Sequence, residues 1–384
     1  MNGFPTGRTA IVGAATFGVG KSPGLDSMDL TVHASLRALE DAGIALSEVD
    51  ALFVAQPQDT LAGLSFADYL GIQPRITDCN RSGGSAFLLQ LEHAALALDA
   101  GYCDVALIAY GSNQATASGA LVQTSRNAFW DAQYKPIRPI SAYALAAARH
   151  MHQYGTTKTQ LAEVAVAARG WAQLNPEAWK RDALSIDDVV NARLVSDPLG
   201  VRDCCLVTDG AAAIVMTRAD RARDCAKRPA YALAAASSVT HADISSMPDL
   251  TVTGAVESGA RAYAQAGLKP ADIDVLQVYD AFTINTLLFL EDLGFCAKGE
   301  GGAFVEGGAI APGGRLAVNT SGGGLSYCHP GMFGLFLLVE SVRQLRGECG
   351  ERQIPDARLA LAHGNGGLLS SQATVILGTE PNTN

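Results

Sequence analysis

The stretch AGIALSEVDALFV, at residues 42–54, recurs as AGLKPADIDVLQV at residues 266–278. Each copy follows an alanine-rich segment typical of a helix and ends in an apolar run typical of a strand. Asp50 of the first copy matches Asp274 of the second. A similarity at this spacing indicates that the chain contains two related halves.

Two further pairs of segments recur in the same order. Asn-Arg-Ser-Gly-Gly at residues 80–84 matches Asn-Thr-Ser-Gly-Gly at residues 319–323, and each precedes an apolar, helix-like segment. LIAYGSN, from residue 107, then matches LALAHGN, from residue 359. We therefore predict an internal duplication in which strands alternate with helices, an arrangement that favours parallel sheets covered by helices.

The helix-like segments that follow the two turns are apolar on nearly all sides, so we expect each to lie buried between two sheets. The path from the turn to the closing glycine is longer in the second copy (323–347) than in the first (84–101). The extra residues surround GLSYCHPG, at 324–331. Tyr, Cys and His added at a helix start in one copy of a duplicated scaffold indicate a functional site.

Residues 115–205 interrupt the duplicated pattern and hold all three tryptophans. We expect this segment to be an insertion that covers the substrate. The predicted domains are an N-terminal half, residues 1–228, which includes the insertion, and a C-terminal half, residues 229–384.

The composition limits the classes of function. The 384 residues are 48% hydrophobic and 17% charged, which is enough to bury a large core, and the formal net charge is -10. Nucleic acids and anionic membranes require a basic surface, and the chain shows no Lys/Arg cluster. The eight cysteines lack the paired spacing of a metal or redox site. We expect a soluble cytoplasmic protein with reduced thiols, without a bound metal, a leader peptide or a membrane span.

Residues 15–22, ATFGVGKS, fit a loose phosphate-loop pattern. A phosphate loop must lead directly into a helix, whereas Pro23 and Gly24 follow here and the helix signal starts near Ser27. The pattern therefore does not predict nucleotide hydrolysis.

Motifs along nearly the whole chain resemble the thiolase superfamily, and within it the sterol-carrier-protein-type branch. They include HMHQYGTTKTQLAEVAV, NPEAW, VSDPLGVRDCCLVTDGAAAIVM, YDAFT, NTSGGGLSYCHPG and HGNGG. The resemblance implies an α/β thiolase fold, in which two βαβαβαββ halves form a five-layered α-β-α-β-α core with a loop-domain insertion. It also implies a homodimer that acts on acyl-CoA thioesters and holds no covalently bound cofactor.

The chain departs from the thiolase pattern at the reactive positions. Thiolases use a cysteine in Cys-x-Ser-Gly, an asparagine in Asn-Glu-Ala-Phe, a histidine in Gly-His-Pro and a second cysteine in Cys-x-Gly. In register with these motifs, Asn80 takes the nucleophile position, and Tyr279 with Asp280 replaces Asn-Glu. His329 is retained, whereas His363 replaces the closing cysteine.

Cys79 lies one residue before the nucleophile position. One helical step turns a side chain by about 100°, away from the required direction, although a one-residue bulge would restore it. Two interpretations stay open, a nucleophile activated at a helix N-terminus and a small buried apolar residue.

Without an acyl-enzyme, the scaffold can still stabilise a thioester enolate, and retro-aldol cleavage of a β-hydroxyacyl-CoA uses such an enolate. YDAFT with SYCHPG resembles the steroid side-chain aldolases of the superfamily, which lack the thiolase cysteine and work with a small partner that carries an OB-type barrel and a zinc ribbon. The resemblance implies that Tyr279 and Tyr327 form an acid/base pair and that His329 donates to the oxyanion.

The sequence leaves alternatives open. The protein could be an acetyl-CoA acyltransferase that uses Cys79, or a non-catalytic acyl-CoA or lipid carrier. Tyr279 and Tyr327 could be core aromatics, and His363 could be a structural hydrogen-bonding group. Cys204 and Cys205 are interpreted as packing residues, and the acyl chain and the CoA-binding residues are not identified.

Overall fold

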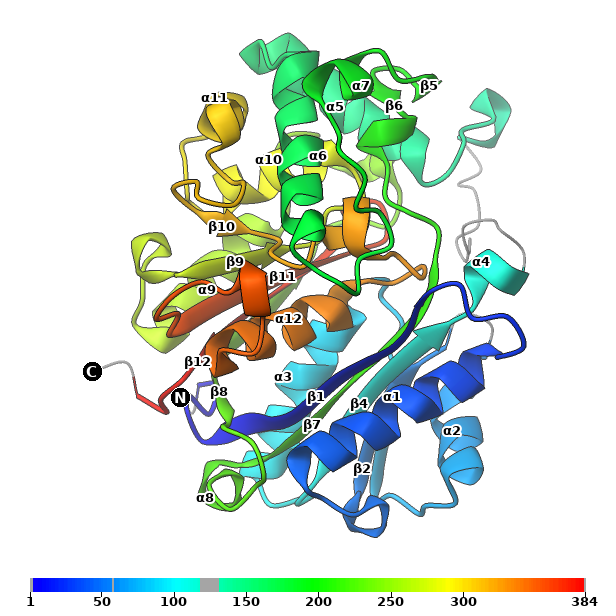
Figure 1. The fold of residues 1–384 in the computed structure, drawn as a ribbon, viewed down its shortest axis with the longest axis vertical. Helices are drawn as coiled ribbons and strands as arrows, with labels where there is room; N and C mark the ends of the chain where they lie inside the picture. Colours follow the sequence, from blue (N-terminus) through cyan, green and yellow to red (C-terminus); the bar gives the residue numbers. More distant parts are fainter. Residues whose placement is uncertain (1–2, 57–58, 118–130, 383–384) are drawn as a thin grey trace.

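A computed structural model describes residues 3–56, 59–117 and 131–382 of the chain (Figure 1). Ten strands form one sheet in the order β10-β9-β11-β12-β8-β1-β7-β4-β2-β3. Their bounds are β1 (Thr9–Gly20), β2 (Ala51–Ala55), β3 (Ile76–Asp78), β4 (Ala106–Ser112), β7 (Asp209–Arg218), β8 (Ala230–Val239), β9 (Val275–Val278), β10 (Ala317–Val318), β11 (Leu359–Gly366) and β12 (Ser371–Gly378).

The sheet consists of two half-sheets with the same topology. The N-half has the order β3-β2-β4-β7-β1 and the C-half the order β10-β9-β11-β12-β8. In both half-sheets the first three strands are parallel to one another, and the fourth strand pairs antiparallel with the third. The half-sheets join through β1 and β8, where Ala10 pairs with Tyr231 and Ile11 with Ala230.

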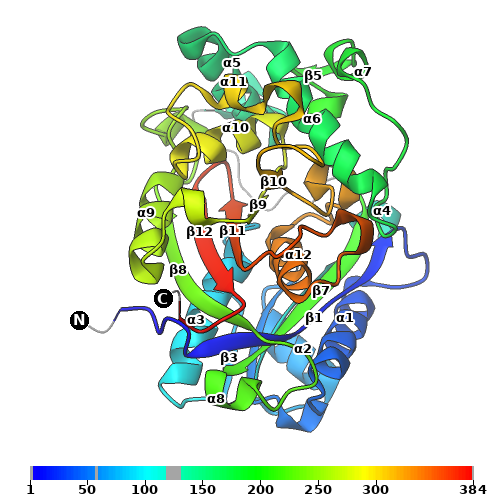
Figure 2. The same cartoon turned by 60° about the vertical axis from the view of Figure 1, so that its left-hand side comes forward.

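Helices complete five layers, as the thiolase fold requires (Figure 2). α1 and α2 cover the outer face of the N-half, and α9 covers that of the C-half. α3 and α12 contact strands of both halves, so the prediction that these two helices lie between sheets is confirmed. The helices of the layers are α1 (Ser27–Ala42), α2 (Ala62–Leu70), α3 (Ala86–Asp99), α9 (Ala255–Ala266) and α12 (Gly334–Arg346).

The repeated sequence folds in the same way in both halves. α1 is followed by the 3-10 turn η1 (Leu46–Glu48) and β2, and α9 by η5 (Pro270–Asp272) and β9. The matched aspartates have matched roles. The Asp50 carboxylate accepts hydrogen bonds from two successive backbone N–H groups at residues 104 and 105, and Asp274 does the same at residues 358 and 359. Each aspartate thereby ties the start of one parallel strand to its neighbour.

The described part of the 115–205 insertion lies at one end of the half-sheets, at the top of Figure 1. Its elements, together with the α4 turn before it, are α4 (Gln114–Ala117), η2 (Ala132–Tyr134), α5 (Ile140–Tyr154), α6 (Lys158–Gln173), α7 (Ile186–Val190), β5 (Leu194–Ser196), β6 (Leu199–Gly200) and η3 (Val201–Asp203). The remaining elements are α8 (Ala219–Ala222), η4 (Ile244–Ser246), α10 (Thr283–Asp292), α11 (Gly301–Val305), η6 (Glu306–Gly308), the π-helical turn η7 (Gly323–Tyr327) and η8 (Gly350–Arg352).

Two expectations from the sequence concern single elements. Residues 15–20 of the loose phosphate-loop pattern lie within β1, and the helix begins at Ser27 as predicted. Across the three described ranges, no helix is long and apolar enough to cross a membrane.

Candidate active site

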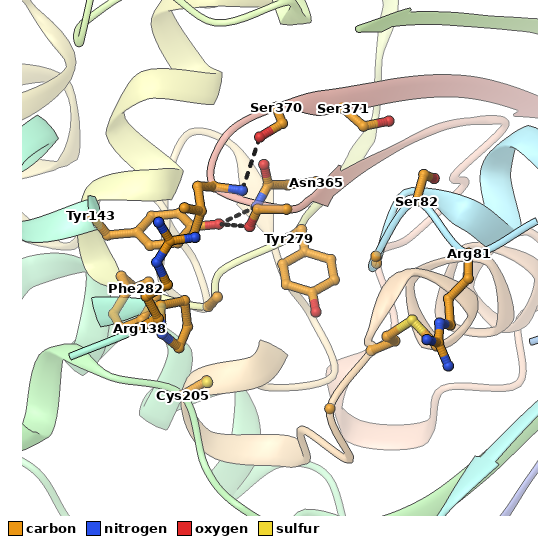
Figure 3. Close-up of a pocket in the computed structure, with 18 of the residues that line it drawn as sticks. Arg81, Ser82, Arg138, Tyr143, Cys205, Tyr279, Phe282, Asn365, Ser370 and Ser371 are labelled. Carbon is orange, nitrogen blue, oxygen red and sulfur yellow. Dashed lines mark hydrogen bonds between the residues drawn. The ribbon is translucent and has the colours of Figure 1, made fainter. Parts of the chain in front are cut away.

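A cavity of about 510 Å³ opens where the two halves and the insertion meet (Figure 3). The N-half contributes residues 81–84, before α3, and Tyr110 of β4. The insertion contributes Arg138 and Tyr143, and the C-half contributes Tyr279, His329 and the turn between β11 and β12. The expectation that the insertion covers the site agrees with this lining.

Tyr279 and His329 form a buried hydrogen-bonded pair. The Tyr279 hydroxyl lies 2.9 Å from His329 Nε2, and the Phe333 N–H donates to the same hydroxyl at 3.2 Å. Both side chains are about 4% exposed. Burial raises the pKa of Tyr279 well above 10 and lowers the pKa of His329 to about 4, so both rings are neutral at neutral pH.

Asp280 supports the segment that carries His329. Its buried carboxylate accepts hydrogen bonds from the N–H groups of Gly324, at 2.6 Å, and Leu325, at 3.4 Å, both in η7. Gly323 has φ 61°, and a Cβ there would lie 2.0 Å from Asp280 Oδ2. Burial raises the pKa of Asp280 to about 7. Asp280 does not line the cavity, and its carboxylate contacts the backbone of η7.

The rings of Tyr327 and Tyr279 both pack against Phe333, but their hydroxyls have different partners. The Tyr327 hydroxyl donates to Glu177 Oε2 at 3.1 Å, and Arg343 Nη1 lies 3.0 Å from the same oxygen. Tyr327 is absent from the lining of the cavity. It lies on η7, and its hydroxyl ties this turn to the insertion.

Cys79 and Asn80 lie outside the cavity. Both are exposed, so the interpretation of Cys79 as a buried apolar residue is wrong. The Asn80 N–H donates to Asp78 Oδ1 at 2.8 Å, and the Asn80 carbonyl accepts from Gln90 Nε2 at 3.3 Å. The next four residues, 81–84, do line the cavity. The turn therefore contributes to the site, although its Cys and Asn do not.

His363 is a fully buried residue of β11. Its Nδ1 lies 2.9 Å from Thr374 Oγ1 and its Nε2 lies 2.9 Å from Gln372 Oε1, and burial lowers its pKa to about 4. It does not line the cavity, whereas Asn365, two residues further along the strand, does. This geometry agrees with the structural interpretation of His363.

Several cavity residues were not predicted from the sequence. Asn365 Nδ2 donates to the Tyr143 hydroxyl at 2.8 Å, which in turn donates to the Gly367 carbonyl at 3.1 Å. Cys205, interpreted as a packing residue, lines the cavity, and burial raises the pKa of its thiol well above 9. The two-residue period of a strand could have indicated Asn365, because it shares a face with His363. Nothing local in the sequence indicates Tyr143 or Cys205.

The described residues include no group of three His, Cys, Asp or Glu side chains that could hold a metal ion. The adjacent Tyr279 hydroxyl and His329 imidazole have the geometry for exchange of a proton.

Comparison with known proteins identifies the class. Residues 236–379 match the family described as thiolase C-terminal domain-like. The chain is 36% identical to an acetyl-CoA acetyltransferase of Methanothermobacter thermautotrophicus, over 93% of this chain and 96% of that protein. The chain therefore belongs to the thiolase superfamily, as the resemblance indicated.

One further relative is named a lyase and one solved structure an aldolase. The chain is 35% identical to a 17-hydroxy-3-oxo-4-pregnene-20-carboxyl-CoA lyase of Mycobacterium tuberculosis, over 89% of this chain and 92% of that protein. The solved Ltp2-ChsH2(DUF35) aldolase superposes with a TM-score of 0.86 at 30% identity, over 97% of this chain and 98% of that chain. The family thus includes both acyltransferases and lyases with similarity along most of this chain.

Proposed function

We propose that the protein is a lyase of lipid degradation, which cleaves a β-hydroxyacyl-CoA by a retro-aldol reaction. The observation that carries the proposal is the buried Tyr279–His329 pair, 2.9 Å apart in a cavity that neither Cys79 nor Asn80 lines. Among the residues that the structure describes, three tyrosines line the cavity. Tyr279 has an imidazole beside its hydroxyl, whereas the hydroxyls of Tyr110 and Tyr143 donate to backbone carbonyls.

The pair can move one proton through the whole reaction. Tyr279 takes the proton of the β-hydroxyl and passes its own proton to His329 Nε2. The electron pair of the O–H bond forms the ketone C=O, the bond between the α and β carbons breaks, and its electrons form the thioester enolate. The imidazolium proton then returns through Tyr279 to the α-carbon, so that a ketone and a shortened acyl-CoA leave. Here His329 acts as a proton acceptor, in addition to the oxyanion role implied by the resemblance.

Backbone groups can stabilise the enolate. Residues 82–84 line the cavity directly before α3, a 14-residue helix. N–H groups at a helix N-terminus lack partners within the helix and carry the positive end of its dipole. Donors of this kind stabilise a negative oxygen in a site that excludes water.

The proposed substrate is a CoA thioester with a tertiary alcohol at the β-carbon. The lyase from Mycobacterium tuberculosis is named for a 17-hydroxy steroid with a 20-carboxyl-CoA group, in which the hydroxyl carbon is tertiary. Such an alcohol cannot be oxidised to a ketone without breaking a carbon-carbon bond. A lyase is therefore the enzyme class that such a substrate requires.

We also propose two protein partners. The solved aldolase neighbour is a complex with ChsH2(DUF35), which supports a small partner protein for this chain. The β3 strand pairs with β2 on one side and ends the described sheet, and an open strand edge favours pairing with a second copy in a homodimer.

The test is product analysis with purified protein, alone and together with a small protein of the DUF35 type. A β-hydroxyacyl-CoA with a tertiary alcohol should release a ketone and a shortened acyl-CoA in equal amounts. Cys79→Ala should retain this activity and Tyr279→Phe should lose it. Loss of activity in Cys79→Ala would overturn the proposal.

A second candidate is acyl transfer through Cys79, which the 36% identity to an acetyl-CoA acetyltransferase favours. This reaction requires a covalent acyl-cysteine. Incubation with acetyl-CoA followed by peptide mass spectrometry should detect an acyl group on the Cys79 peptide if this candidate is correct. Binding of acyl-CoA with neither an acyl-peptide nor a released ketone would indicate a carrier.

A further inference from the structure

The segment 329–333 carries both hydrogen-bond partners of the Tyr279 hydroxyl. These partners are His329 Nε2, at 2.9 Å, and the Phe333 N–H, at 3.2 Å. The segment runs between η7 and α12, outside any regular helix or strand. The geometry of the proton-transfer pair therefore depends on what holds this short connection in place.

Tyr110 holds the middle of the segment from the opposite half of the molecule. It lies on β4 of the N-half, and its hydroxyl donates to the Pro330 carbonyl. The Met332 N–H donates to the same hydroxyl at 3.1 Å. One side chain thus makes two contacts, which lie between His329 and Phe333.

The anchor itself is rigid. Tyr110 is fully buried, and its ring packs against Phe87 of α3 with the ring centroids 5.0 Å apart. Its backbone belongs to β4, which pairs with β2 on one side and β7 on the other. A buried aromatic on a central strand has little freedom to move, so the contacts to Pro330 and Met332 restrict the segment.

The backbone of the segment is shaped for this contact. Gly331 has φ 93°, and a Cβ there would lie 3.2 Å from the Tyr110 hydroxyl oxygen. Two other groups hold the first residue of the segment. Gln114 Nε2 donates to the His329 carbonyl at 2.8 Å, and the His329 N–H donates to Thr208 Oγ1 at 3.0 Å. Both groups come from the N-half of the chain.

Tyr110 lines the cavity but is not suited to proton transfer. Its hydroxyl proton points at a backbone carbonyl, which is not a base at any physiological pH. Burial raises the pKa of its hydroxyl well above 10. Its contribution must therefore act through the residues that it holds.

We propose that Tyr110 is a positioning residue, which fixes segment 329–333 so that His329 Nε2 and the Phe333 N–H meet the Tyr279 hydroxyl together. The proposal rests on the retro-aldol function above. It assigns to the N-half a role in the chemistry of the C-half through one side chain.

The kinetic test is Tyr110→Phe, which keeps the ring and removes the hydroxyl. We expect kcat to fall by about 10- to 100-fold, because a small misplacement of reacting groups has an effect of this size, and KM to change less than twofold. The matched control is Tyr263→Phe, because the buried Tyr263 hydroxyl has no hydrogen-bond partner among the described residues. The control should retain the wild-type kcat. A wild-type kcat in Tyr110→Phe, or a rise in KM alone, would overturn the proposal.

A second measurement does not depend on the reaction. In Tyr110→Phe, amide hydrogen exchange at Met332 and Phe333 should accelerate at least tenfold, whereas exchange in β7 and β12 should stay unchanged. If the wild-type protein cleaves no β-hydroxyacyl-CoA, the proposed function fails, and the exchange experiment still decides whether Tyr110 fixes the segment. Unchanged exchange at these two amides would refute the positioning role.

Where Tyr110→Phe does not fold, Gln114→Ala replaces it. This variant removes the bond to the His329 carbonyl at the start of the same segment and lies on the short α4 turn. It should lower kcat by several-fold without raising KM and should accelerate exchange at the amides of segment 329–333. No change in either quantity would count against the anchoring of the segment by the N-half.

Discussion

The turns before α3 and before α12 are copies of one unit, yet they contribute differently to the site. In the N-half, α3 begins at Ala86, directly after the turn. In the C-half, η7 and segment 329–333 come between the turn and Gly334, where α12 begins. The duplication supplied two equivalent turns, and the additional residues after one of them bring His329 to within 2.9 Å of the Tyr279 hydroxyl.

The matched asparagines show the same divergence. Asn319 is buried with φ 53°, and its Oδ1 accepts from the Val278 N–H at 2.8 Å, directly before Tyr279. Asn80 is exposed and is held by Asp78 at the end of the edge strand. Asn319 supports the backbone directly before Tyr279, whereas Asn80 belongs to a solvent-exposed turn. An identical residue type in a repeat therefore does not imply an identical role.

The most direct test of this difference between the halves is to remove the candidate reactive groups of each half. We expect Tyr279→Phe and His329→Ala to lower kcat/KM by about 10²- to 10⁴-fold, the usual effect of losing a general acid or base. Cys79→Ala in the N-half should stay within twofold of wild type. Steady-state kinetics with the tertiary β-hydroxyacyl-CoA measures all three. Equal losses in both halves would mean that the N-terminal turn also takes part in the chemistry.

The pH dependence of kcat/KM distinguishes the buried His329 from an imidazole with an ordinary pKa. His329 must be neutral to accept a proton, and burial lowers its pKa to about 4 from 6.5. We therefore expect kcat/KM to stay high as the pH falls through 6 and then to decrease about tenfold per pH unit below about 4.

Asp280 is a second titrating group near His329, because burial raises its pKa to about 7 and its carboxylate holds the η7 turn that precedes His329. The Asp280→Asn variant is therefore the control that removes the carboxyl titration. An inflection near pH 6.5 that persists in this variant would contradict the low pKa of His329.

The second glycines of the two turns, Gly84 and Gly323, allow a matched comparison. A Cβ at Gly84 would lie 1.9 Å from Tyr279 Cε2, so Gly84→Ala should displace the Tyr279 ring and lower kcat about 100-fold. A Cβ at Gly323 would meet the Asp280 carboxylate at a positive φ, so Gly323→Ala should lower the free energy of unfolding by about 1–3 kcal/mol. Kinetics and urea unfolding measure the two effects.

Gly101→Ala is the control for these two variants. Gly101 has φ 74°, and a Cβ there would meet nothing within 4 Å. It should show a modest loss of stability and the wild-type kcat. If Gly101→Ala lowered kcat as much as Gly84→Ala, the loss in Gly84→Ala could not be attributed to displacement of the Tyr279 ring.

The smallest expected effect comes from Tyr327→Phe. The change removes a hydrogen bond to Glu177 and should lower the free energy of unfolding by about 0.5–1.5 kcal/mol, with kcat/KM reduced less than threefold. Chemical denaturation and kinetics on the same preparation give both values. A loss as large as that of Tyr279→Phe would restore Tyr327 as the acid/base partner implied by the resemblance.

Much of the fold could be predicted because its signals lie in short stretches of sequence and occur in both halves. A helix closed by a glycine and a buried strand recur before and after the turns that lead to Asp50 and Asp274, and the apolar helices α3 and α12 indicate burial on both sides. The location of the extra residues near η7 followed from comparing the distance between the turn and the closing glycine in the two copies. These signals depend on residues close together in the chain, so the sequence contains them.

The site was less predictable because its geometry depends on distant contacts. Nothing near Tyr327 in the sequence indicates that its hydroxyl meets Glu177 in the insertion. Cys205 and Tyr143 reach the cavity only because the insertion folds back over the C-half. The motif comparison paired Tyr279 with Tyr327, whereas in the structure the Tyr279 hydroxyl meets His329 and the Tyr327 hydroxyl meets Glu177, because side-chain direction is not contained in a motif.

The pairing of β1 with β7 and β8 has a consequence for biosynthesis. β1 is complete at residue 20, whereas β7, its principal partner, begins at Asp209 and β8 at Ala230. While the ribosome makes the intervening chain, an apolar strand has no partner, and unpaired strands of this kind promote aggregation. The edges of β1 therefore stay open for nearly 200 residues of synthesis, and the strand that joins the two half-sheets is paired on both edges only after Ala230 has been made.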